Sequence, residues 1–93
     1  MTAPSAVTIS VVDAPACHLC EDAVEALAAM AAEYPLAVTR IAGGSPEGQA
    51  LMARHRAPMS PLVLVDGELF SWGRLPRKKL RRLLDARMPG RVA

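Results

Sequence analysis

The apolar positions in the first part of the chain change from a strand-like to a helix-like spacing. Residues 7–12 are largely β-branched and mostly apolar, which predicts a strand inside a sheet that is covered on both faces. From residue 18 to residue 33 the apolar positions recur every three or four residues, which predicts a helix that Pro35 ends. The expected buried face of this helix consists of Cys20, Val24, Leu27 and Ala31.

The middle of the chain predicts a second strand and a second helix. The strand is expected over residues 36–41. Ser45 and Pro46 predict the start of the helix, because a hydroxyl can cap the first turn and proline fits the first helical position. We expect this helix to run to about His55.

The C-terminal part predicts a hairpin followed by a last helix. Residues 62–65 and residues 68–72 predict two strands, and Asp66-Gly67 between them is a strong signal for a type I′ hairpin turn. The last helix is expected to start at residues 75–76. Its apolar stripe consists of Leu80, Leu83 and Leu84.

The order of the predicted elements is β-α-β-α-β-β-α, which is an α/β arrangement. A strand-helix-strand start favours parallel pairing, whereas the hairpin favours an antiparallel edge. We therefore expect a four-stranded mixed sheet flanked by three helices. The 93 residues fit one domain, residues 1–93, with its core at about residues 7–88.

The composition is that of a globular domain with few aromatic residues. Hydrophobic residues make up 52% of the chain and aromatic residues only 3%, so the core must be built from Leu, Val, Ile, Ala and Met. No basic segment precedes an apolar stretch near the N-terminus, and no apolar run approaches the roughly 20 residues that a bilayer span needs. We therefore expect a cytoplasmic protein with no membrane partner.

The net charge of +2 hides two segments of opposite sign. Residues 74–93 contain eight Lys or Arg and one Asp, a balance of +7, whereas residues 1–73 contain three basic and eight acidic residues, a balance of −5. The basic residues of the last helix are expected to form a solvated face or to dock an acidic partner. Nucleic acid, held by attraction to its phosphates, is not the partner that we expect.

The chain contains two cysteines, Cys17 and Cys20, at the start of the first helix. In the cytosol such a pair is not a structural staple, and it closes too small a ring to constrain the unfolded chain. The free N–H groups at a helix start favour the thiolate, and Cys-X-X-Cys thiols can have pKa values of roughly 3.5–7.5. We therefore expect Cys17 to attack a disulfide and Cys20 to resolve the mixed disulfide that forms.

Two alternatives for the cysteine pair stay open, a zinc site and a pair of idle buried thiols. Zinc needs two further ligands, and the other ligands of the kind that zinc prefers are His18 and His55. His18 stands between the cysteines and cannot easily join the same tetrahedron. It could lower the pKa of the Cys17 thiol if its protonated ring folded back, or it could be a solvated residue at the helix start.

Three features together resemble the glutaredoxin branch of the thioredoxin superfamily. They are Cys17-His18-Leu19-Cys20 after the first strand, Pro61 directly before the third strand, and Asp66-Gly67 after four strand residues. The resemblance covers roughly residues 7–86. It implies a thioredoxin-like fold and a glutaredoxin-like thiol-disulfide oxidoreductase that reduces protein or mixed disulfides through its two catalytic cysteines.

The resemblance also implies which residues bind the substrate. In this family the proline before the third strand is cis and lies against the cysteines, so we expect a cis Ser60–Pro61 bond, with Pro58 as a competing candidate. The Ser60 backbone would then pair with the chain of the substrate. His18, between the cysteines, and Gly73, in the turn after the fourth strand, complete the expected substrate-binding set.

Departures from the family pattern leave the electron source open. Members that use glutathione have Pro-Tyr where this chain has His18-Leu19, and a lysine where it has Ala14. They also have a glycine-rich turn and an acid in the region that is residues 71–76 here. Part of that region is similar to the Trp-Ser-Gly-Phe segment of the redoxins that supply electrons to ribonucleotide reductase, which is an alternative function.

The expected partners follow from these observations. No bound cofactor or metal is expected, and a low-molecular-weight thiol or a reductase of the thioredoxin-reductase type would supply the electrons. The substrates would be protein disulfides, and the protein would act as a monomer. A different alternative is an interaction module that keeps the fold with little turnover. Trp72 is expected in the core of an edge strand rather than as an exposed platform, and Met59 is expected to serve packing.

Overall fold

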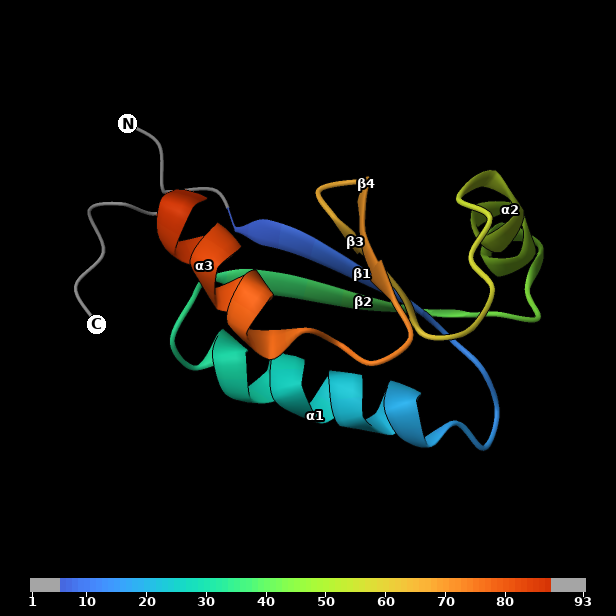
Figure 1. Ribbon diagram of the computed structural model, residues 1–93, viewed down its shortest axis with the longest axis horizontal. Helices are drawn as coiled ribbons and strands as arrows, with labels where there is room; N and C mark the ends of the chain where they lie inside the picture. The colour runs from blue at the N-terminus through green and yellow to red at the C-terminus, as the bar shows by residue number, and fades with distance from the viewer. Residues whose placement is uncertain (1–5, 88–93) are drawn as a thin grey trace.

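The computed structural model describes residues 6–87 (Figure 1). The elements follow in the order β1 (Val7–Asp13), α1 (His18–Ala31), β2 (Leu36–Ala42), α2 (Pro46–Arg54), β3 (Leu62–Val65), β4 (Glu68–Trp72) and α3 (Arg77–Arg87). Each predicted element is present, and its ends differ from the prediction by at most two residues. The two ends of the predicted domain, and the expected limit of its core at residue 88, lie outside the described residues.

The four strands form one mixed sheet in the order β2-β1-β3-β4. The pair β1–β2 is parallel and the pair β3–β4 is antiparallel, as the sequence predicts, and the pair β1–β3 is antiparallel as well. In this register Val12, near the end of β1, pairs with Leu62 at the start of β3, which pairs with Trp72 at the end of β4. The end of β1, the start of β3 and the end of β4 therefore lie side by side.

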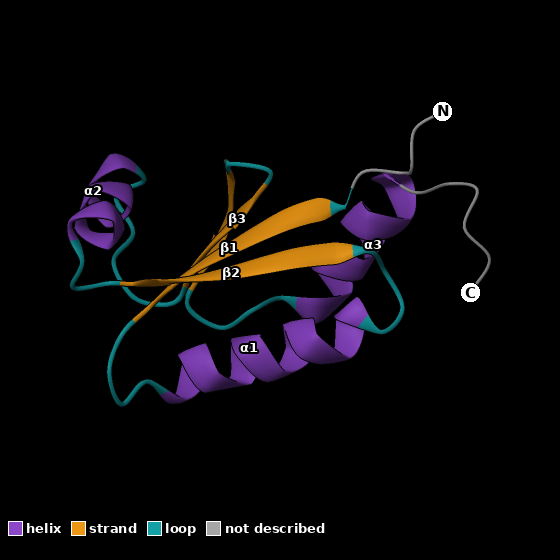
Figure 2. Ribbon diagram, turned by 180° about the vertical axis from the view of Figure 1, so that it is seen from behind, coloured by secondary structure: helices purple, strands orange, loops and turns teal. Residues whose placement is uncertain are grey.

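The three helices cover the two faces of the sheet unequally. Helices α1 and α3 pack on one face, where they enclose the larger apolar cluster (Figures 1 and 2). That cluster includes Ile9 and Val11 from the sheet, Leu27 from α1 and Leu80 from α3. Helix α2 packs on the other face through a much smaller cluster, in which Val12, Leu62 and Leu64 are buried. None of the helices within residues 6–87 is long and apolar enough to cross a membrane.

The buried face of α1 differs from the predicted one. Cys20 and Leu27 are buried as expected, but Val24 is only half-buried and Ala31 is exposed. The other buried positions of the helix are Ala23, Ala26 and Met30. The helix carries apolar residues on most of its circumference, so periodicity alone could not fix which of them face the sheet.

Ion pairs tie the basic helix α3 to the acidic part of the chain. The Arg77 guanidinium lies 2.5 Å from a carboxylate oxygen of Asp22 on α1. Arg81 donates two hydrogen bonds to Glu33, just beyond the end of the same helix, at 3.0 and 2.8 Å. Part of the opposite charge of the two segments is therefore neutralised within the molecule. On the other side of α3, Leu80 and Leu84 face the core and Leu83 is partly buried, as predicted.

The predicted hairpin turn is confirmed by its backbone conformation. Asp66 and Gly67 have φ values of 50° and 83°, the left-handed values that a type I′ turn requires at both central positions. Asp66 also accepts a hydrogen bond from the N–H of Thr8 at 2.9 Å and forms an ion pair with Arg87. The hairpin is thereby attached to β1 and to the end of α3.

Candidate active site

Three loops meet at one end of the sheet, because the strands that they join pair there. The segment after β1 leads into α1, residues 58–61 lead into β3, and the segment after β4 leads into α3. Pairing of Val12 with Leu62 and of Leu62 with Trp72 places these loops at the same end. The expected site residues Cys17, Ser60 and Gly73 belong to these three loops.

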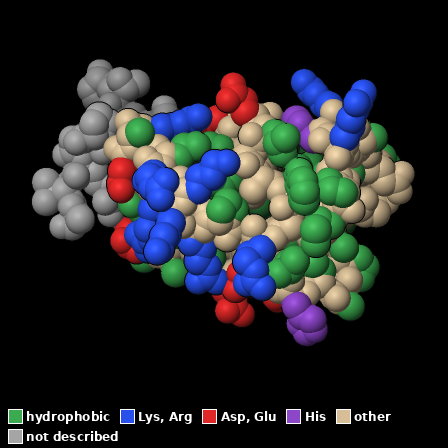
Figure 3. All heavy atoms as spheres, in the orientation of Figure 1, with side chains coloured by type: hydrophobic (Ala, Val, Ile, Leu, Met, Phe, Trp, Pro, Cys, Tyr) green, Lys and Arg blue, Asp and Glu red, His purple; other side chains and the backbone are tan. Residues whose placement is uncertain are grey.

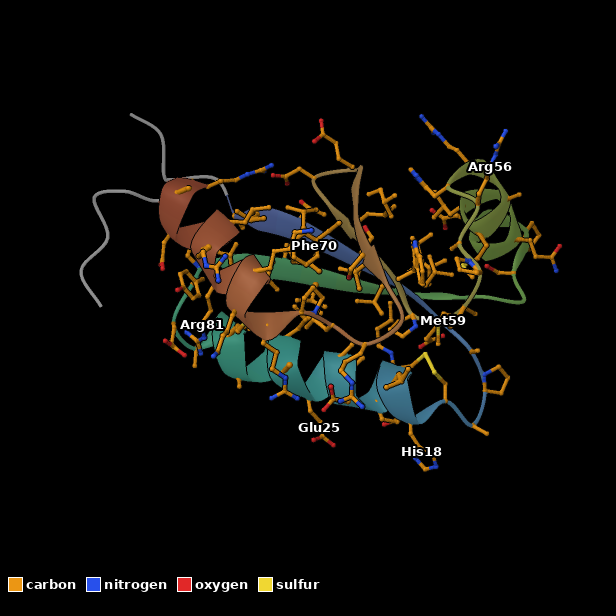
Figure 4. The ribbon with its side chains drawn as sticks, viewed as in Figure 1. His18, Glu25, Arg56, Met59, Phe70 and Arg81 are labelled. Atoms are coloured by element: carbon orange, nitrogen blue, oxygen red, sulfur yellow. A yellow bond between two sulfur atoms is a disulfide. The ribbon has the colours of Figure 1, made fainter. Side chains whose placement is uncertain are left out.

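Cys17 and Cys20 form a disulfide at the start of α1 (Figure 4). Cys17 is the N-cap residue of the helix, and its Sγ accepts a hydrogen bond from the N–H of Cys20 at 3.1 Å. The Cys17 side chain is partly exposed, whereas Cys20 is only 1% exposed. This is the arrangement that the sequence predicts, an accessible first sulfur at the helix start and a buried second one.

The backbone turn before α1 places the Cys17 side chain close to the N–H of Cys20. Ala16 has a φ of 51°, a left-handed conformation that residues with a side chain seldom adopt. Cys17 then has extended backbone angles, and its C=O accepts the N–H of Glu21 at 3.1 Å, which begins the helical bonding. The side-chain sulfur is thus free to cap the N–H of Cys20. No sequence signal marks Ala16 for this conformation.

The charged residues next to the cysteines include His18, which could favour a thiolate, and Asp22, which disfavours one. His18 is exposed, and its ring points away from the disulfide, so it does not fold back over the sulfur (Figure 4). Asp22, whose negative charge would disfavour a nearby thiolate, is paired with Arg77. The N–H of Cys20 at the helix start is therefore the direct partner of the Cys17 sulfur, and Arg77 compensates the charge of one acidic residue.

The Ser60–Pro61 bond is cis, as the resemblance implies, and Pro58 is not the cis proline. Pro61 is fully buried, and its C=O accepts the N–H of Gly73 at 2.9 Å. Gly73 has a φ of 79°, which favours glycine at this position. The structure therefore brings Ser60, Pro61 and Gly73 together, whereas His18 lies on the outer side of α1.

Two exposed apolar residues beside these loops were not predicted as site residues. Met59 is 43% exposed, and Trp72 is 47% exposed, so the interpretation of Trp72 as a core residue is wrong. β4 is an edge strand, and α2 packs beside β1 and β2 instead of covering β4. The Met59 side chain packs against Gly73, and Figure 4 draws it beside the disulfide. Packing was the expected role of Met59, but its exposure was not expected.

Within residues 6–87, no three His, Cys, Asp or Glu side chains gather where they could hold a metal ion. His18 and His55, the two further ligands considered for zinc, lie on different elements: His18 begins α1 and His55 follows α2. The two cysteines are joined to each other. A disulfide of this kind can be reduced to two thiols and re-formed, which is the chemistry that the cysteine pair can perform.

Of three comparisons with known proteins, the one with solved structures found a match. No protein-family model matches the chain, and no curated protein matches it. Among solved structures, the chain is similar to a mutant thioredoxin from Halobacterium salinarum NRC-1, with a TM-score of 0.62 and 23% identity. The match covers 86% of this chain and 73% of the thioredoxin. The chain thus has the thioredoxin-like fold, with a Cys-X-X-Cys disulfide at the start of its first helix.

Proposed function

We propose that this protein is a thiol-disulfide oxidoreductase that exchanges disulfides through Cys17 and Cys20. The observation that carries the proposal is the Cys17–Cys20 disulfide, with Sγ of Cys17 at the helix start and bonded to the N–H of Cys20. An N–H that donates to this sulfur stabilises a negative charge on it, because the thiolate is the stronger acceptor. The buried second sulfur stands within bonding distance.

In the first step, the reduced Cys17 attacks as a thiolate one sulfur of a target disulfide. A bond forms between Cys17 Sγ and that sulfur, the target's S–S bond breaks, and the other target sulfur leaves as a thiolate that takes up a proton. Partial exposure of Cys17 gives the target access to it. The donor N–H of Cys20 lowers the cost of holding the charge on the attacking sulfur before this step.

In the second step, Cys20 loses its proton and attacks Cys17 Sγ. The mixed disulfide breaks, the target leaves as its second thiolate, and the Cys17–Cys20 bond re-forms. The target has then gained two electrons and two protons, and the protein is oxidised. Because Cys20 stands next to Cys17, the attack is intramolecular, and its burial shields the Cys20 sulfur itself from external thiols.

More specifically, we propose a glutaredoxin-like redoxin that works on protein or mixed disulfides. The element order of residues 7–87 and the loops that carry Cys17, Pro61 and Gly73 support this assignment. A low-molecular-weight thiol or a reductase of the thioredoxin-reductase type would return the two electrons. We propose that the protein acts in the cytoplasm as a monomer, with Ser60, Pro61 and Gly73 beside the bound target.

The test is reduction of insulin disulfides, followed by turbidity, with dithiothreitol as the electron source. Cys17→Ser should abolish the activity, whereas reduced Cys20→Ser, mixed with insulin after removal of dithiothreitol, should accumulate a mixed disulfide that mass spectrometry detects. The proposal fails if the Cys17→Ser protein retains the wild-type rate. Ala53→Ser, an exposed position on α2, is a control that should leave the rate unchanged.

A further inference from the structure

Most of the large apolar side chains that are exposed within residues 6–87 gather on one part of the molecule. Met59, Leu69 and Trp72 are 43%, 46% and 47% exposed, and they belong to β4 and to the loop before β3. Val38, at 37%, lies on β2 at the opposite edge of the sheet. The space-filling view shows hydrophobic atoms gathered beside a basic area on this side of the molecule (Figure 3). Exposed apolar groups that gather in this way mark interaction sites.

The strand register shows that Leu69 and Trp72 project from the same face of β4. Leu69 pairs with Leu64, and Trp72 pairs with Leu62, and residues paired across two strands share a face. Leu62 and Leu64 belong to the smaller apolar cluster under α2, so that face is the α2 face. Leu62 and Leu64 stand two positions apart, about 7 Å along the strand. Leu69 and Trp72 therefore form a continuous strip, which we call the β4 strip.

Phe70 and Ser71, which stand between Leu69 and Trp72 in the sequence, project from the other face of β4 because the strand has a bulge. The pairing shifts between Val63 and Leu64, so that β4 has one residue more than its partner strand. Phe70 packs against the larger cluster, with Nζ of Lys79 5.2 Å from the centre of its ring. The strand thus presents apolar side chains on both faces, but a helix covers only the Phe70 side.

The β4 strip continues directly into the candidate active site. Trp72 precedes Gly73, whose N–H bonds to the C=O of Pro61 and against which Met59 packs. A chain bound along the strip would therefore reach the loop in front of Cys17. β4 is also the last strand of the sheet, so its outer edge pairs with no other strand among residues 6–87.

The two ends of the strip carry opposite charges. Arg74 follows Gly73 and is exposed, at the end of β4 that leads into the candidate active site. It forms no ion pair with a carboxylate among the described residues, in contrast to Arg77. The acidic neighbour is Glu68, at the end of β4 that lies away from Gly73. A bound segment with acidic side chains near its reacting cysteine would match this pattern.

We propose that the β4 strip docks an extended segment of the target protein that carries large apolar residues flanked by acidic ones. Apolar side chains of the segment lie on Leu69 and Trp72, and acidic side chains near the target disulfide lie beside Arg74. This inference deepens the proposed function and rests on it, because it names the class of target. It predicts a preference for such polypeptides over small disulfides.

Trp72 is the one tryptophan of the chain, so its fluorescence reports binding at the strip itself. The probe is a short cysteine-free peptide with a Leu-Phe pair between glutamates. Two matched peptides replace the apolar pair by serines or the glutamates by lysines. The first peptide should shift the emission of Trp72 in a saturable way, and both matched peptides should bind about tenfold more weakly or worse. Equal affinity for all three would overturn the inference.

Variants separate the strip from the rest of the surface. Leu69→Ser and Arg74→Glu should each weaken binding of the first peptide about tenfold. Val38→Ala, on the far edge strand, and Arg56→Glu, on an exposed basic residue after α2 that points away from the disulfide (Figure 4), are the matched controls and should bind as the wild type does. Wild-type affinity in both Leu69→Ser and Arg74→Glu would refute the strip.

Because the peptide has no cysteine, binding does not depend on disulfide exchange. Binding without any insulin reduction would mean that the docking surface exists and the proposed chemistry is wrong. Insulin reduction with no discrimination among the peptides would mean that the proposed chemistry is right and the docking surface is wrong. If the emission of Trp72 changed with protein concentration alone, a second copy would cover the strip, which would also overturn the inference. In kinetics, Leu69→Ser should lower kcat/KM for a cysteine-containing version of the peptide and leave reduction of hydroxyethyl disulfide unchanged.

Discussion

The Met59 side chain lies against Gly73 in the loop that faces the cysteines. Its Sδ is 3.2 Å from the position that a Cβ on residue 73 would occupy. Gly73 also has a φ of 79°, so two independent features favour glycine there, a left-handed backbone and a close neighbour. The contact connects the loop before β3 to the loop after β4, which is the part of the site where a target chain would lie.

We expect Gly73→Ala to lower both stability and activity. The left-handed backbone costs an alanine about 1 kcal/mol, and the new methyl group displaces Met59 from the site. Gly67→Ala is the matched control, because its φ is 83° and a Cβ there meets nothing within 4 Å. Urea unfolding should show a similar loss in both variants, and only Gly73→Ala should slow insulin reduction. Equal activity of the two variants would contradict a role for the Met59 contact.

Gly48 lets helix α2 sit close to the end of β2. A Cβ on this residue would lie 2.1 Å from the C=O oxygen of Ala42, and the backbone would have to move. We expect Gly48→Ala to lower the free energy of unfolding by about 1–3 kcal/mol, as overpacked positions do. Gly44→Ala, where nothing lies within 4 Å, should be neutral or slightly stabilising. Urea denaturation measures the free energy of unfolding of both variants. Equal values would show that α2 can move to accommodate the methyl group and would contradict the prediction.

Local sequence signals predicted most of the fold. Ser45 and Pro46 start α2 as expected, because the hydroxyl of Ser45 accepts the N–H of Gly48 at 3.0 Å. Asp66 and Gly67 form the turn that their residue types favour. The face of α1 was predicted less well, since Ala31 is exposed and Met30 buried. In a helix with apolar residues nearly all round, the neighbouring strands decide which residues are buried, and periodicity does not contain that information.

The sequence predicted the positions of the two cysteines, but it did not predict the positions of all the residues around them. The roles of Cys17 and Cys20 as cap and buried partner follow from their spacing at a helix start. The exposure of Trp72 depends on α2 lying over β1 and β2, a tertiary feature that no local pattern encodes. The position of the His18 ring, away from the sulfurs, was equally open from the sequence. Motifs therefore located the disulfide at the helix start, and the packing of distant elements decided what surrounds it.

The Ser71 hydroxyl is buried and has no hydrogen-bond partner within the described chain. An unpartnered buried polar group costs about 1–3 kcal/mol, so we expect Ser71→Ala to raise the free energy of unfolding by about 1 kcal/mol. Ser45→Ala is the opposite case, because that hydroxyl caps α2 and bonds to Ala42, and it should cost about 1 kcal/mol. Urea denaturation compares the two. A loss of stability in Ser71→Ala would reveal a partner that binds this hydroxyl.

Tyr34 donates a hydrogen bond to Asp85 at 2.8 Å, joining the end of α1 to α3. This bond, together with burial, raises the pKa of Tyr34 above its usual value near 10. Since folding favours the protonated phenol, its contribution to stability is complete below pH 10 and is lost as the pH rises through the raised pKa. Tyr34→Phe should therefore unfold at a lower temperature than the wild type at pH 7–9, and the difference should shrink above pH 10. A pH-independent difference would point to packing instead of the hydrogen bond.

The reactivity of reduced Cys17 should follow from the backbone of α1 more than from His18. The N–H of Cys20 donates to Cys17 Sγ, which favours the thiolate. Alkylation by iodoacetamide should therefore reach half its maximal rate at a pH below about 8.5, which is the pKa of a free cysteine thiol. Cys20, which is 1% exposed, should react much more slowly. Mass spectrometry of the alkylated peptides separates the two sites.

Two variants test which neighbours of Cys17 matter. His18→Ala should leave the alkylation midpoint nearly unchanged, because the ring points away from the sulfurs. Arg77→Ala should move the midpoint to higher pH by a fraction of a unit, since it leaves the negative charge of Asp22 without its 2.5 Å partner near the helix start. The shift should shrink in 0.5 M salt, because both side chains are partly exposed and salt screens them. A larger shift for His18→Ala than for Arg77→Ala would mean that the imidazole turns toward Cys17 once the disulfide is reduced.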